Sequence, residues 1–345
     1  MTGGTRLMVL MAAMASVSWG LTGLVRRYAR LRLLDVPNAR SSHSNPTPRG
    51  GGAAVVLAWL TALWLVPAPG GRELVLAFSG GLAVAAVGFV DDHRPLAARY
   101  RMAVHVAAAG WALWCLGGLP LAAVAGRFWA LGWMGSALAL VTVVWMLNLF
   151  NFIDGIDGLA GSEAVFVAGA AGLLGQLWFP ESGLGLLNLL LAAACLGFLA
   201  WNWPPASIFM GDVGSGFIGF ALGVAAIASA GHGGPGLAVW LILSGVFVAD
   251  ASYTLLWRMA SGQRWFEAHR SHAYQHAVAV LGGHRPVTLA VWGINLGWLL
   301  PLAVLAIAHP AYELRCLLLA YAPLVAIAAA LGAGRTEGRR AGGLA

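Results

Sequence analysis

Charged residues are scarce in this sequence. Only 10% of its 345 residues are Asp, Glu, Lys or Arg, and 60% are hydrophobic, whereas a soluble domain carries about 25% charged residues. This composition leaves too little polar surface to cover a water-soluble globule of this size. The scarcity of charge therefore excludes a soluble protein and predicts an integral membrane protein.

Lysine is absent and cysteine is rare. All 20 basic residues are arginine, and the three cysteines, Cys115, Cys195 and Cys316, each stand alone in an apolar run. Because they show no CxxC pattern or metal-ligand spacing, a disulfide framework is excluded and buried apolar packing is favoured. The net charge of +7 would elsewhere suggest nucleic acid. Here the arginines lie in short loops between apolar runs, so we expect no nucleic-acid partner and a lipid bilayer around the protein.

The first apolar run, residues 7–24, lacks the basic flank of a cleaved signal peptide. Only Arg6 precedes it, whereas Arg26, Arg27, Arg30 and Arg32 follow it. A signal peptide carries its basic region in front of the apolar run. We therefore expect a retained helix whose N-terminus lies outside the cell.

Long apolar runs recur along the chain. A membrane-spanning helix needs about 20 apolar residues, and we expect such helices near 7–24, 53–68, 74–90, 102–119, 132–149, 162–179, 183–201, 214–231, 237–257, 287–307 and 316–333. The second run is short, and the 120–132 region is ambiguous. The pattern predicts an all-α polytopic membrane protein of about eleven helices, in a single domain over residues 1–345.

The arginines are distributed unevenly between the two sides of this topology. With the N-terminus outside, sixteen arginines fall on the cytoplasmic side and four outside, as the positive-inside rule requires. An even number of spans would place the basic C-terminal tail outside. We therefore prefer eleven spans and a cytoplasmic C-terminus.

Polar side chains concentrate in the loops that this topology places in the cytoplasm. These loops are 25–52, 91–101, 148–161, 202–216 and 258–286, and six of the seven aspartates lie in or beside them. The outer loops are short and carry few functional groups. We therefore expect an active site that faces the cytoplasm.

The densest of these polar segments reads NLFNFIDGIDGLAG. Asn148, Asn151, Asp154 and Asp157 recur every three residues, a spacing that places them on one side of a helix end or turn. Asn and Asp with Gly are also ordinary turn formers, but a turn does not need four of them. Their oxygens suit a hard cation, a nucleobase edge or a sugar.

Two further segments supply carboxylates. Asp91 and Asp92 end the third apolar run, where they are either solvated end charges or a site for Mg²⁺ or a proton, and the nearby Arg94 and Arg99 favour an anionic ligand. Asp212 lies in the Gly-rich segment FMGDVGSG, which enters a helix. Helix N-termini attract phosphate, and one carboxylate with substrate phosphates commonly holds Mg²⁺.

The remaining polar segments are basic. The segment HRSHAYQH contains His269, Arg270 and His272. Zinc is one interpretation of such histidines, but the arginines around them suit a diphosphate better. The first loop adds His43 and Arg49, which either form a basic juxtamembrane anchor or close over an anion.

Asp250 differs because it lies inside the ninth apolar run. An acidic residue within the membrane is a functional candidate by default, and we expect it to pair with Arg258 or to face the cytoplasmic cleft. It supports an alternative function, a transporter or ion pump. Transporters place their acidic residues near the bilayer midplane, however, whereas the other carboxylates cluster at one face. A non-catalytic lipid-binding scaffold would leave those carboxylates unexplained.

Five motifs in order resemble one family. They are DxPxxRxxHxxPxPRGGG at 35–52, DD at 91–92, NxxNxxDGxDGLAG at 148–161, FMGDxGSxxxG at 209–219 and HRSHAYQH at 269–276. The set is similar to the polyprenyl-phosphate N-acetylhexosamine-1-phosphate transferases of glycosyltransferase family 4. The histidine motif resembles the branch that initiates O-antigen and exopolysaccharide. His93 and Arg94 stand where many relatives carry other residues.

The resemblance implies an enzyme of the bacterial inner membrane. It would transfer N-acetylhexosamine 1-phosphate from a UDP-sugar to undecaprenyl phosphate, release UMP and start a surface glycan such as O-antigen. Mg²⁺, or alternatively Mn²⁺, would be required, and a homodimer is one candidate assembly. Asp212 would hold the metal with Asn151 as co-ligand, and Asp91 and Asp92 would position or deprotonate the lipid phosphate.

The resemblance also assigns the substrate-binding residues. Asp154 and Asp157 would line the nucleotide pocket, and Phe209 would stack on uracil. His269, Arg270 and His272 would neutralise the diphosphate or bind the sugar. Asn148, Asn151, His43 and Arg49 are the further residues expected to bind substrate.

Overall fold

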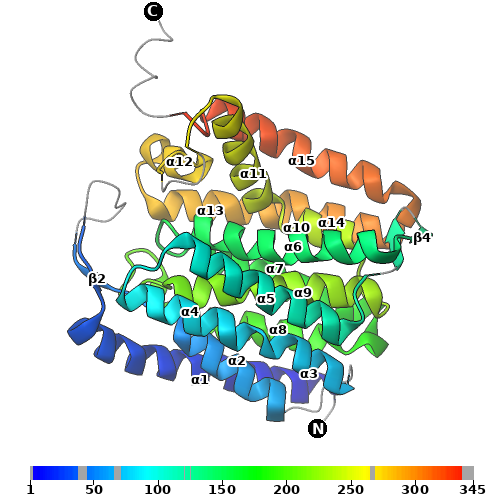
Figure 1. Cartoon of the computed structure of the whole chain (residues 1–345), viewed down its shortest axis with the longest axis horizontal. Helices are drawn as coiled ribbons and strands as arrows, with labels where there is room; N and C mark the ends of the chain where they lie inside the picture. The colour runs from blue at the N-terminus through cyan, green and yellow to red at the C-terminus, as the bar shows by residue number, and fades with distance from the viewer. Residues whose placement is uncertain are drawn as a thin grey trace, which may run out of the picture.

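The computed structural model shows a bundle of long helices that run roughly parallel to one another (Figure 1). It describes residues 3–37, 45–65, 71–119, 121–124, 126–264 and 269–335. The first helix starts at one end of the bundle and the last helix finishes at the other (Figure 1).

In the part of the chain that the structure describes, the first half contains six helices and two short hairpins. They are α1 (Gly3–Arg32), β1 (Leu34–Asp35), β2 (Thr47–Pro48), α2 (Gly52–Leu65), α3 (Gly71–Ser79), α4 (Gly81–His93), α5 (Ala98–Leu116), β3 (Leu121–Val124), β4 (Arg127–Ala130) and α6 (Gly132–Ile153).

Within the described residues, every regular element of the second half is a helix or helical turn. Its elements are α7 (Leu159–Trp178), η1 (Pro180–Ser182), α8 (Leu184–Asn202), α9 (Asp212–Gly231), α10 (Leu237–Leu243), α11 (Gly245–Ala260), α12 (Ala273–Leu281), α13 (His284–Ile294), the π-helical turn η2 (Asn295–Leu299), α14 (Leu300–Ala308), η3 (Pro310–Tyr312) and α15 (Glu313–Ala330).

Every apolar run expected to span the membrane contains a helix. Within the described residues, eight helices or continuous helix pairs are long and apolar enough to cross a bilayer, and α10 with α11 would be a ninth span bent by 83°. The short second run forms the 14-residue helix α2. The helical polytopic class is therefore confirmed, while the count of eleven stays a prediction.

The two hairpins are the departure from an all-helical chain. β1 pairs antiparallel with β2, and β3 pairs antiparallel with β4 in the register Leu121–Ala130 to Val124–Arg127. The second hairpin occupies the ambiguous 120–132 region. Its β4 residues are all exposed, so this segment folds at the bundle surface instead of spanning it.

The centre of the bundle is α9. Its apolar window is 94% buried, against 17% for α1 and 28% for α15. Glycines let its neighbours approach: a Cβ on Gly88 of α4 would collide with the backbone of Asp212, and a Cβ on Gly52 of α2 with the backbone of Gly214. Small residues commonly allow such close contacts between membrane helices.

A buried polar pair joins two helices far apart in sequence. Asn295, in the π-helical turn, donates a hydrogen bond from Nδ2 to Oε1 of Glu163 on α7. Both side chains are buried. A π-turn often occurs at a local functional or packing constraint. Here the hydrogen bond connects the turn between α13 and α14 to α7.

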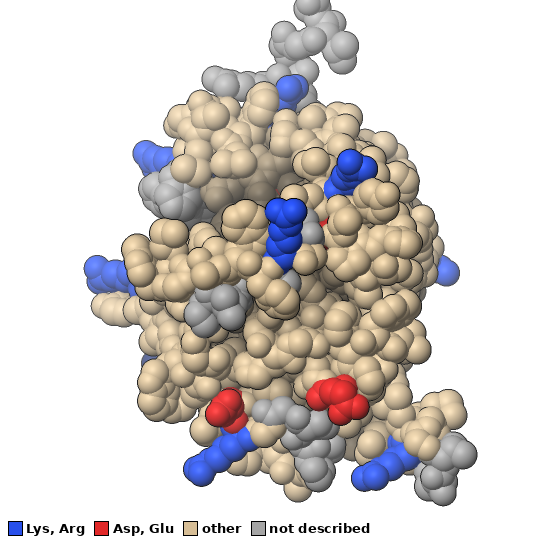
Figure 2. Space-filling model, turned by 90° about the vertical axis from the view of Figure 1, so that its right-hand side faces the viewer, with Lys and Arg blue, Asp and Glu red and all other residues tan. Residues whose placement is uncertain are grey.

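The two ends of the bundle differ in their polar content. We call the end that carries residues 33–37, 45–51, 94–97, 154–158, 203–211, 261–264 and 269–272 of the connections between helices the polar end. The opposite end, which faces the viewer in Figure 2, is mostly uncharged with scattered basic and acidic groups. Because the polar side chains are concentrated in the connections of the polar end, we look for the site there.

Candidate active site

The N-terminus of α9 is held by an aspartate from another helix. Oδ1 of Asp92 accepts the N–H of Asp212 at 3.1 Å, and its Oδ2 accepts the N–H of Val213 at 3.2 Å. The side chain of Asp92 is only 1% exposed. It therefore satisfies two of the free N–H groups that every helix start presents. Asp92 anchors α4 to the start of α9.

Asp91 faces a different partner. One guanidinium nitrogen of Arg101, on α5, lies 2.6 Å from Oδ2 of Asp91 and 2.9 Å from Oδ2 of Asp212. Oδ1 of Asp91 also accepts the N–H of Leu96. Asp91 on α4 and Asp212 on α9 thus both contact the guanidinium of Arg101. About a third of the Asp212 side chain remains exposed.

The convergence of Asp91 and Asp212 is a suitable site for a hard cation. Mg²⁺ usually takes one or two carboxylates and completes its ligand set with water and substrate phosphates. In the described residues no cluster of three or more His, Cys, Asp or Glu side chains is arranged to hold a metal by itself. The donors present therefore fit a metal that binds together with a phosphate ligand, and do not fit a closed protein cage.

Asp154 lies beside this cluster, in the turn between α6 and α7. Burial raises its pKa well above the usual range, and the negative charges of Asp212 and Asp92 raise it further. A hydrogen bond from the backbone of Gly211 opposes that effect. Asp154 is thus close enough to the start of α9 to be affected by the charges of Asp212 and Asp92. A cation bound there would lower the pKa of Asp154.

Asp157 is used to join segments. Its Oδ2 accepts the N–H of Ala206 at 3.0 Å, and Nδ1 of His284 lies 3.3 Å from its Oδ1. Thr288 donates its hydroxyl to the carbonyl oxygen of Asp157. These contacts connect the turn after α6 to the 203–211 connection and to α13. Asp157 therefore fixes the positions of these segments relative to one another.

The two predicted amides differ in placement. The hydroxyl of Ser215 on α9 donates to Oδ1 of Asn151 at 2.9 Å, so Asn151 lies against the first turn of α9. Asn148 donates to the carbonyl oxygen of Val144 within its own helix. Phe209 is half-buried, and its carbonyl oxygen accepts the N–H of Gly51 at 2.9 Å.

Arg49 reaches the cluster from the first loop. Its guanidinium donates to the carbonyl oxygens of Asp91 and Asp92, and its Nε lies 3.6 Å from Oδ1 of Asp92. The β1–β2 hairpin and the Gly50–Gly52 backbone bring it there. His43, predicted with it, lies outside the described residues.

The histidine segment forms a separate group around the start of α12. The ring of His269 is hydrogen-bonded to the hydroxyl of Ser271 at 3.0 Å, and its ring centroid lies 4.9 Å from that of His272. Burial, with the positive charges of His272 and Arg258, lowers the pKa of His269 to about 4. Arg270 is exposed beside them. His269 is therefore a neutral hydrogen-bonding group near pH 7.

Asp250 has partners other than the expected Arg258. Its carboxylate accepts the N–H groups of Ala273 and Tyr274 at 2.8 and 3.1 Å, and lies 3.4 Å from Nδ1 of His272. Arg258 instead donates to Gln263 and to the carbonyl oxygen of Arg264. Asp250 is thus the cap of α12, which removes the observation that favoured a transporter.

Sequence reasoning missed several residues of the site. It favoured Arg94 and Arg99, but both are exposed, and the arginine that reaches the carboxylates is Arg101. The feature that could have revealed Arg101 is its position one turn inside α5, which runs antiparallel to α4 and so returns past the end of α4. Asn202 was also missed: it accepts the N–H of Gly158 and donates to the carbonyl oxygen of Ile208, which closes the 203–211 connection.

These observations define a class of protein. A multi-pass helical membrane protein that gathers carboxylates and arginines at a helix N-terminus, at one end of its bundle, is built to handle anionic substrates at a membrane surface. The site combines groups for a cation and for phosphate at one place.

Comparisons with known proteins identify the family. Residues 74–230 match the model of glycosyl transferase family 4. The chain is 30% identical to decaprenyl-phosphate N-acetylglucosaminephosphotransferase of Mycolicibacterium smegmatis, over 81% of this chain and 77% of the relative. It is 33% identical to phospho-N-acetylmuramoyl-pentapeptide-transferase of Moorella thermoacetica, over 72% of this chain and 81% of the relative.

A third relative is the probable undecaprenyl-phosphate N-acetylglucosaminyl 1-phosphate transferase of Bacillus subtilis, 25% identical over 80% of this chain and 78% of the relative. The chain belongs to the polyprenyl-phosphate N-acetylhexosamine-1-phosphate transferase superfamily, glycosyl transferase family 4. It is a multi-pass membrane transferase.

Proposed function

We propose that the protein transfers N-acetylhexosamine 1-phosphate from a UDP-sugar to undecaprenyl phosphate. The observation that carries the proposal is the convergence of Asp91 and Asp212 on Arg101 at the start of α9. Two carboxylates and a guanidinium at a helix N-terminus match what a diphosphate and its cation require.

The reaction is a direct displacement at phosphorus. An oxygen of the lipid phosphate attacks the sugar-bearing phosphorus of the donor, a new P–O bond forms, and the bond to the bridging oxygen breaks so that UMP leaves. The acceptor has a second pKa of about 6 and is mostly dianionic near pH 7. A strong base is barely needed, and positioning with charge neutralisation should dominate.

Each cluster residue has a role in this scheme. Asp212 and Asp91 would hold Mg²⁺, or Mn²⁺, with Asn151 as a further oxygen ligand, and the metal would neutralise the diphosphate. Arg101, which lies beside both carboxylates, would contribute positive charge to a phosphate group of the donor. Asp92 would act as a positioning residue because its oxygens are engaged at the start of α9.

The histidine segment and the turn after α6 would bind the rest of the donor. Because His269 is neutral near pH 7, it suits hydrogen bonding to the sugar, which leaves Arg270 to contribute positive charge. Asp154 would face the nucleotide sugar from the other side. Phe209 remains our candidate for stacking on uracil.

The pathway assignment rests on the relatives and on the histidine motif. Two of the relatives named above act, by name, on N-acetylglucosamine phosphate, so N-acetylglucosamine is the first sugar to test. We propose that the enzyme lies in a bacterial inner membrane and starts the synthesis of O-antigen or a related surface glycan. The opposite placement of the first and last helix ends (Figure 1) supports an odd number of spans, with the N-terminus outside and the polar end in the cytoplasm.

UMP release from purified protein tests this function. The protein in detergent would receive undecaprenyl phosphate and a panel of UDP-N-acetylhexosamines, with Mg²⁺ or with EDTA. We expect release only when lipid, donor and Mg²⁺ are present together. Release without lipid would contradict the proposed reaction, and labelled phosphate trapped on the protein by donor alone would replace direct attack with a two-step route.

A further inference from the structure

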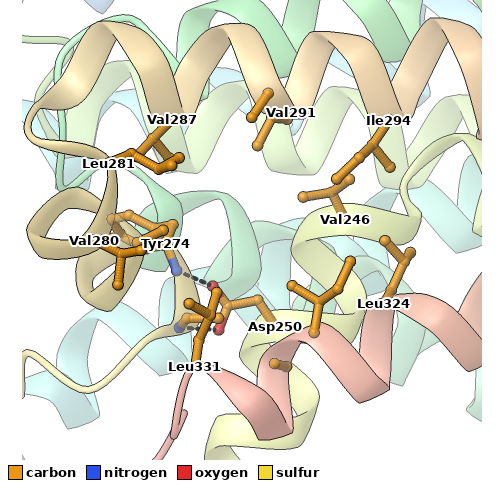
Figure 3. Close-up of a pocket in the computed structure, with 15 residues that line it drawn as sticks. Val246, Asp250, Tyr274, Val280, Leu281, Val287, Val291, Ile294, Leu324 and Leu331 are labelled. Carbon is orange, nitrogen blue, oxygen red and sulfur yellow. Dashed lines mark hydrogen bonds between the residues drawn. The ribbon is translucent and has the colours of Figure 1, made fainter.

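Asp250 is a buried carboxylate that the reaction proposed above does not use. Figure 3 shows it beside the first turn of α12, with hydrogen bonds to backbone nitrogens of that turn. Its Oδ1 accepts the N–H of Ala273 and the hydroxyl of Thr254, and its Oδ2 accepts the N–H of Tyr274. Because a buried carboxylate needs such donors, these three contacts fix the position of both oxygens.

The imidazole of His272 lies against the same carboxylate. Its Nδ1 is 3.4 Å from Oδ1 of Asp250, and both side chains are buried. Among the residues that the structure describes, Nδ1 makes no hydrogen bond to another group. An unprotonated Nδ1 would place a lone pair beside a negative oxygen, whereas a protonated Nδ1 places an N–H there. The contact therefore favours a proton on Nδ1, because the partner of one ring nitrogen decides which nitrogen is protonated.

Three neighbouring rings restrict the rotation of this imidazole. The ring centroid of His272 is 4.9 Å from that of His269, 5.7 Å from that of Tyr274 and 5.9 Å from that of Phe152. Because the two ring nitrogens point in different directions, Nε2 faces away from Asp250. With Nδ1 at the carboxylate and the ring packed among its neighbours, Nε2 is the ring nitrogen that a ligand can use.

The start of α12 is packed against the turn between α6 and α7. The hydroxyl of Tyr274 donates to the carbonyl oxygen of Phe152 at 2.9 Å, and a Cβ on Gly155 would collide with that hydroxyl. Burial raises the pKa of Tyr274, and the negative charge of Asp154 contributes to the rise. His272 therefore lies beside the turn that carries one of the carboxylates expected to meet the nucleotide sugar.

We propose that Asp250 is a positioning residue for the transferase, because it keeps a proton of His272 on Nδ1 and so presents Nε2 to the nucleotide sugar. The proposal rests on the function proposed above, in which the histidine segment binds the donor. Asp250 itself does not contact substrate, since its oxygens are engaged by α12 and by Thr254. Without this acceptor, the proton of a neutral ring could move to Nε2, and the ring would offer the UDP-sugar the opposite hydrogen-bonding group.

Nitrogen NMR of the full-length protein with isotope-labelled histidine tests the tautomer directly. The signals of His272 are those that disappear in His272→Asn, and spectra are recorded at high pH, where a neutral ring carries one proton. We expect the proton on Nδ1 in wild type and in Thr254→Val, and a shift toward Nε2 in Asp250→Ala. A proton on Nε2 in wild type would overturn the proposal, even if Asp250→Ala fails to fold.

Steady-state kinetics of UMP release separate positioning from helix capping. In Asp250→Ala we expect the KM for the UDP-sugar to rise at least about tenfold, the effect of one lost hydrogen bond, while the KM for undecaprenyl phosphate stays unchanged. Asp250→Asn, which keeps an oxygen that can face Nδ1, should recover part of this loss. Thr254→Val is the matched control, because it removes one donor from the same carboxylate and leaves the contact with His272 in place. An equal rise of both KM values in Asp250→Ala would reduce Asp250 to a cap.

A double-mutant cycle tests whether Asp250 acts through His272. In the His272→Asn background, Asp250→Ala should add no further rise in the KM for the UDP-sugar, because residues that act through one contact are not additive. A full additive rise would overturn the proposal. The NMR spectra need neither substrate nor turnover, so a wild type that releases no UMP would contradict the proposed function alone.

Discussion

The two ends of the same helices are built in different ways. At the polar end, Asp91 and Asp92 are buried and joined to the start of α9. At the opposite end, aromatic side chains are exposed: Trp64 is 64%, Trp114 74% and Trp133 80% exposed. Exposed aromatic rings at helix ends are typical of a membrane interface. The comparison shows that the exposed aromatic rings lie at one end of the bundle and the buried carboxylates of the candidate site at the other.

The difference arises from how the connections are held. Polar-end segments are joined across helices, as where Asn202 holds both Gly158 and Ile208. The β3–β4 hairpin of the opposite end pairs with itself, and the residues of β4 are all exposed. Carboxylates can be kept close to one another only in the first arrangement, because each needs donors when it leaves water.

The largest expected effect at the polar end comes from Arg101. In Arg101→Gln the donor diphosphate loses a cation, and we expect kcat to fall by roughly 10²–10³. The same change removes the competitor of Mg²⁺ for Asp91 and Asp212, so metal should bind the donor-free protein more tightly in a titration. Arg99→Gln is the control, because Arg99 is exposed and lies over Tyr100. Weaker metal binding in Arg101→Gln would contradict this placement.

The adjacent aspartates should separate into two roles. Asp91→Asn keeps an acceptor for the N–H of Leu96 but weakens the charge facing Arg101, so kcat should fall about 10²-fold with little change in Tm. Asp92→Asn replaces one acceptor oxygen at the α9 start by a donor. It should cost about 1–3 kcal/mol of stability, measured as a lower Tm. Identical profiles of Tm and kcat for the two variants would show that the roles are not distinct.

The close approach of α4 to α9 can be broken without touching a functional group. In Gly88→Ala the new Cβ collides with the backbone of Asp212, so α4 must move and its aspartates with it. We expect activity to fall roughly tenfold and stability by about 1–3 kcal/mol. Gly110→Ala on α5 is the control, since nothing lies within 4 Å of its added Cβ. Equal behaviour of the two variants would argue against a contact this tight.

The smallest effect is a pH dependence at the histidine segment. The folded protein holds the pKa of His269 at about 4, below the ordinary value of 6.5. The unfolded chain therefore binds a proton first as pH falls, and stability is lost between about pH 6.5 and 4. In His269→Asn the decline of Tm across this window should be shallower. A slope unchanged from wild type would mean that His269 is not buried as a neutral ring.

Much of this architecture could be predicted because its signals are local. Apolar length marked where helices form, although the count of eleven spans stays a prediction, and the spacing in NLFNFIDGIDGLAG marked a polar turn between two helices. Asp91, Asp212 and Asn151 do meet at the start of α9. The structure of the 120–132 region was ambiguous in the sequence because the residues of the 121–130 hairpin are too apolar to indicate a surface turn.

The roles of individual side chains could not be predicted, because they depend on distance between helices. No sequence pattern distinguishes Asp92, which caps α9, from Asp91 beside it. Asp250 resembles an intramembrane acidic residue in sequence, yet it caps α12 once residues 23 and 24 positions away return to it. Arg101 was passed over for Arg94 and Arg99 because only the packing of α5 against α4 selects among the three.

The central claim is that the carboxylates of the polar end perform the transfer and that the opposite end does not. Lipid-dependent UMP release by Asp212→Asn, compared with Glu181→Gln in an exposed position of the opposite end, tests it most directly. We predict that Asp212→Asn loses at least roughly 10³-fold in turnover while it inserts and melts like wild type, and that Glu181→Gln keeps wild-type turnover. Turnover at the wild-type rate in Asp212→Asn would contradict the account.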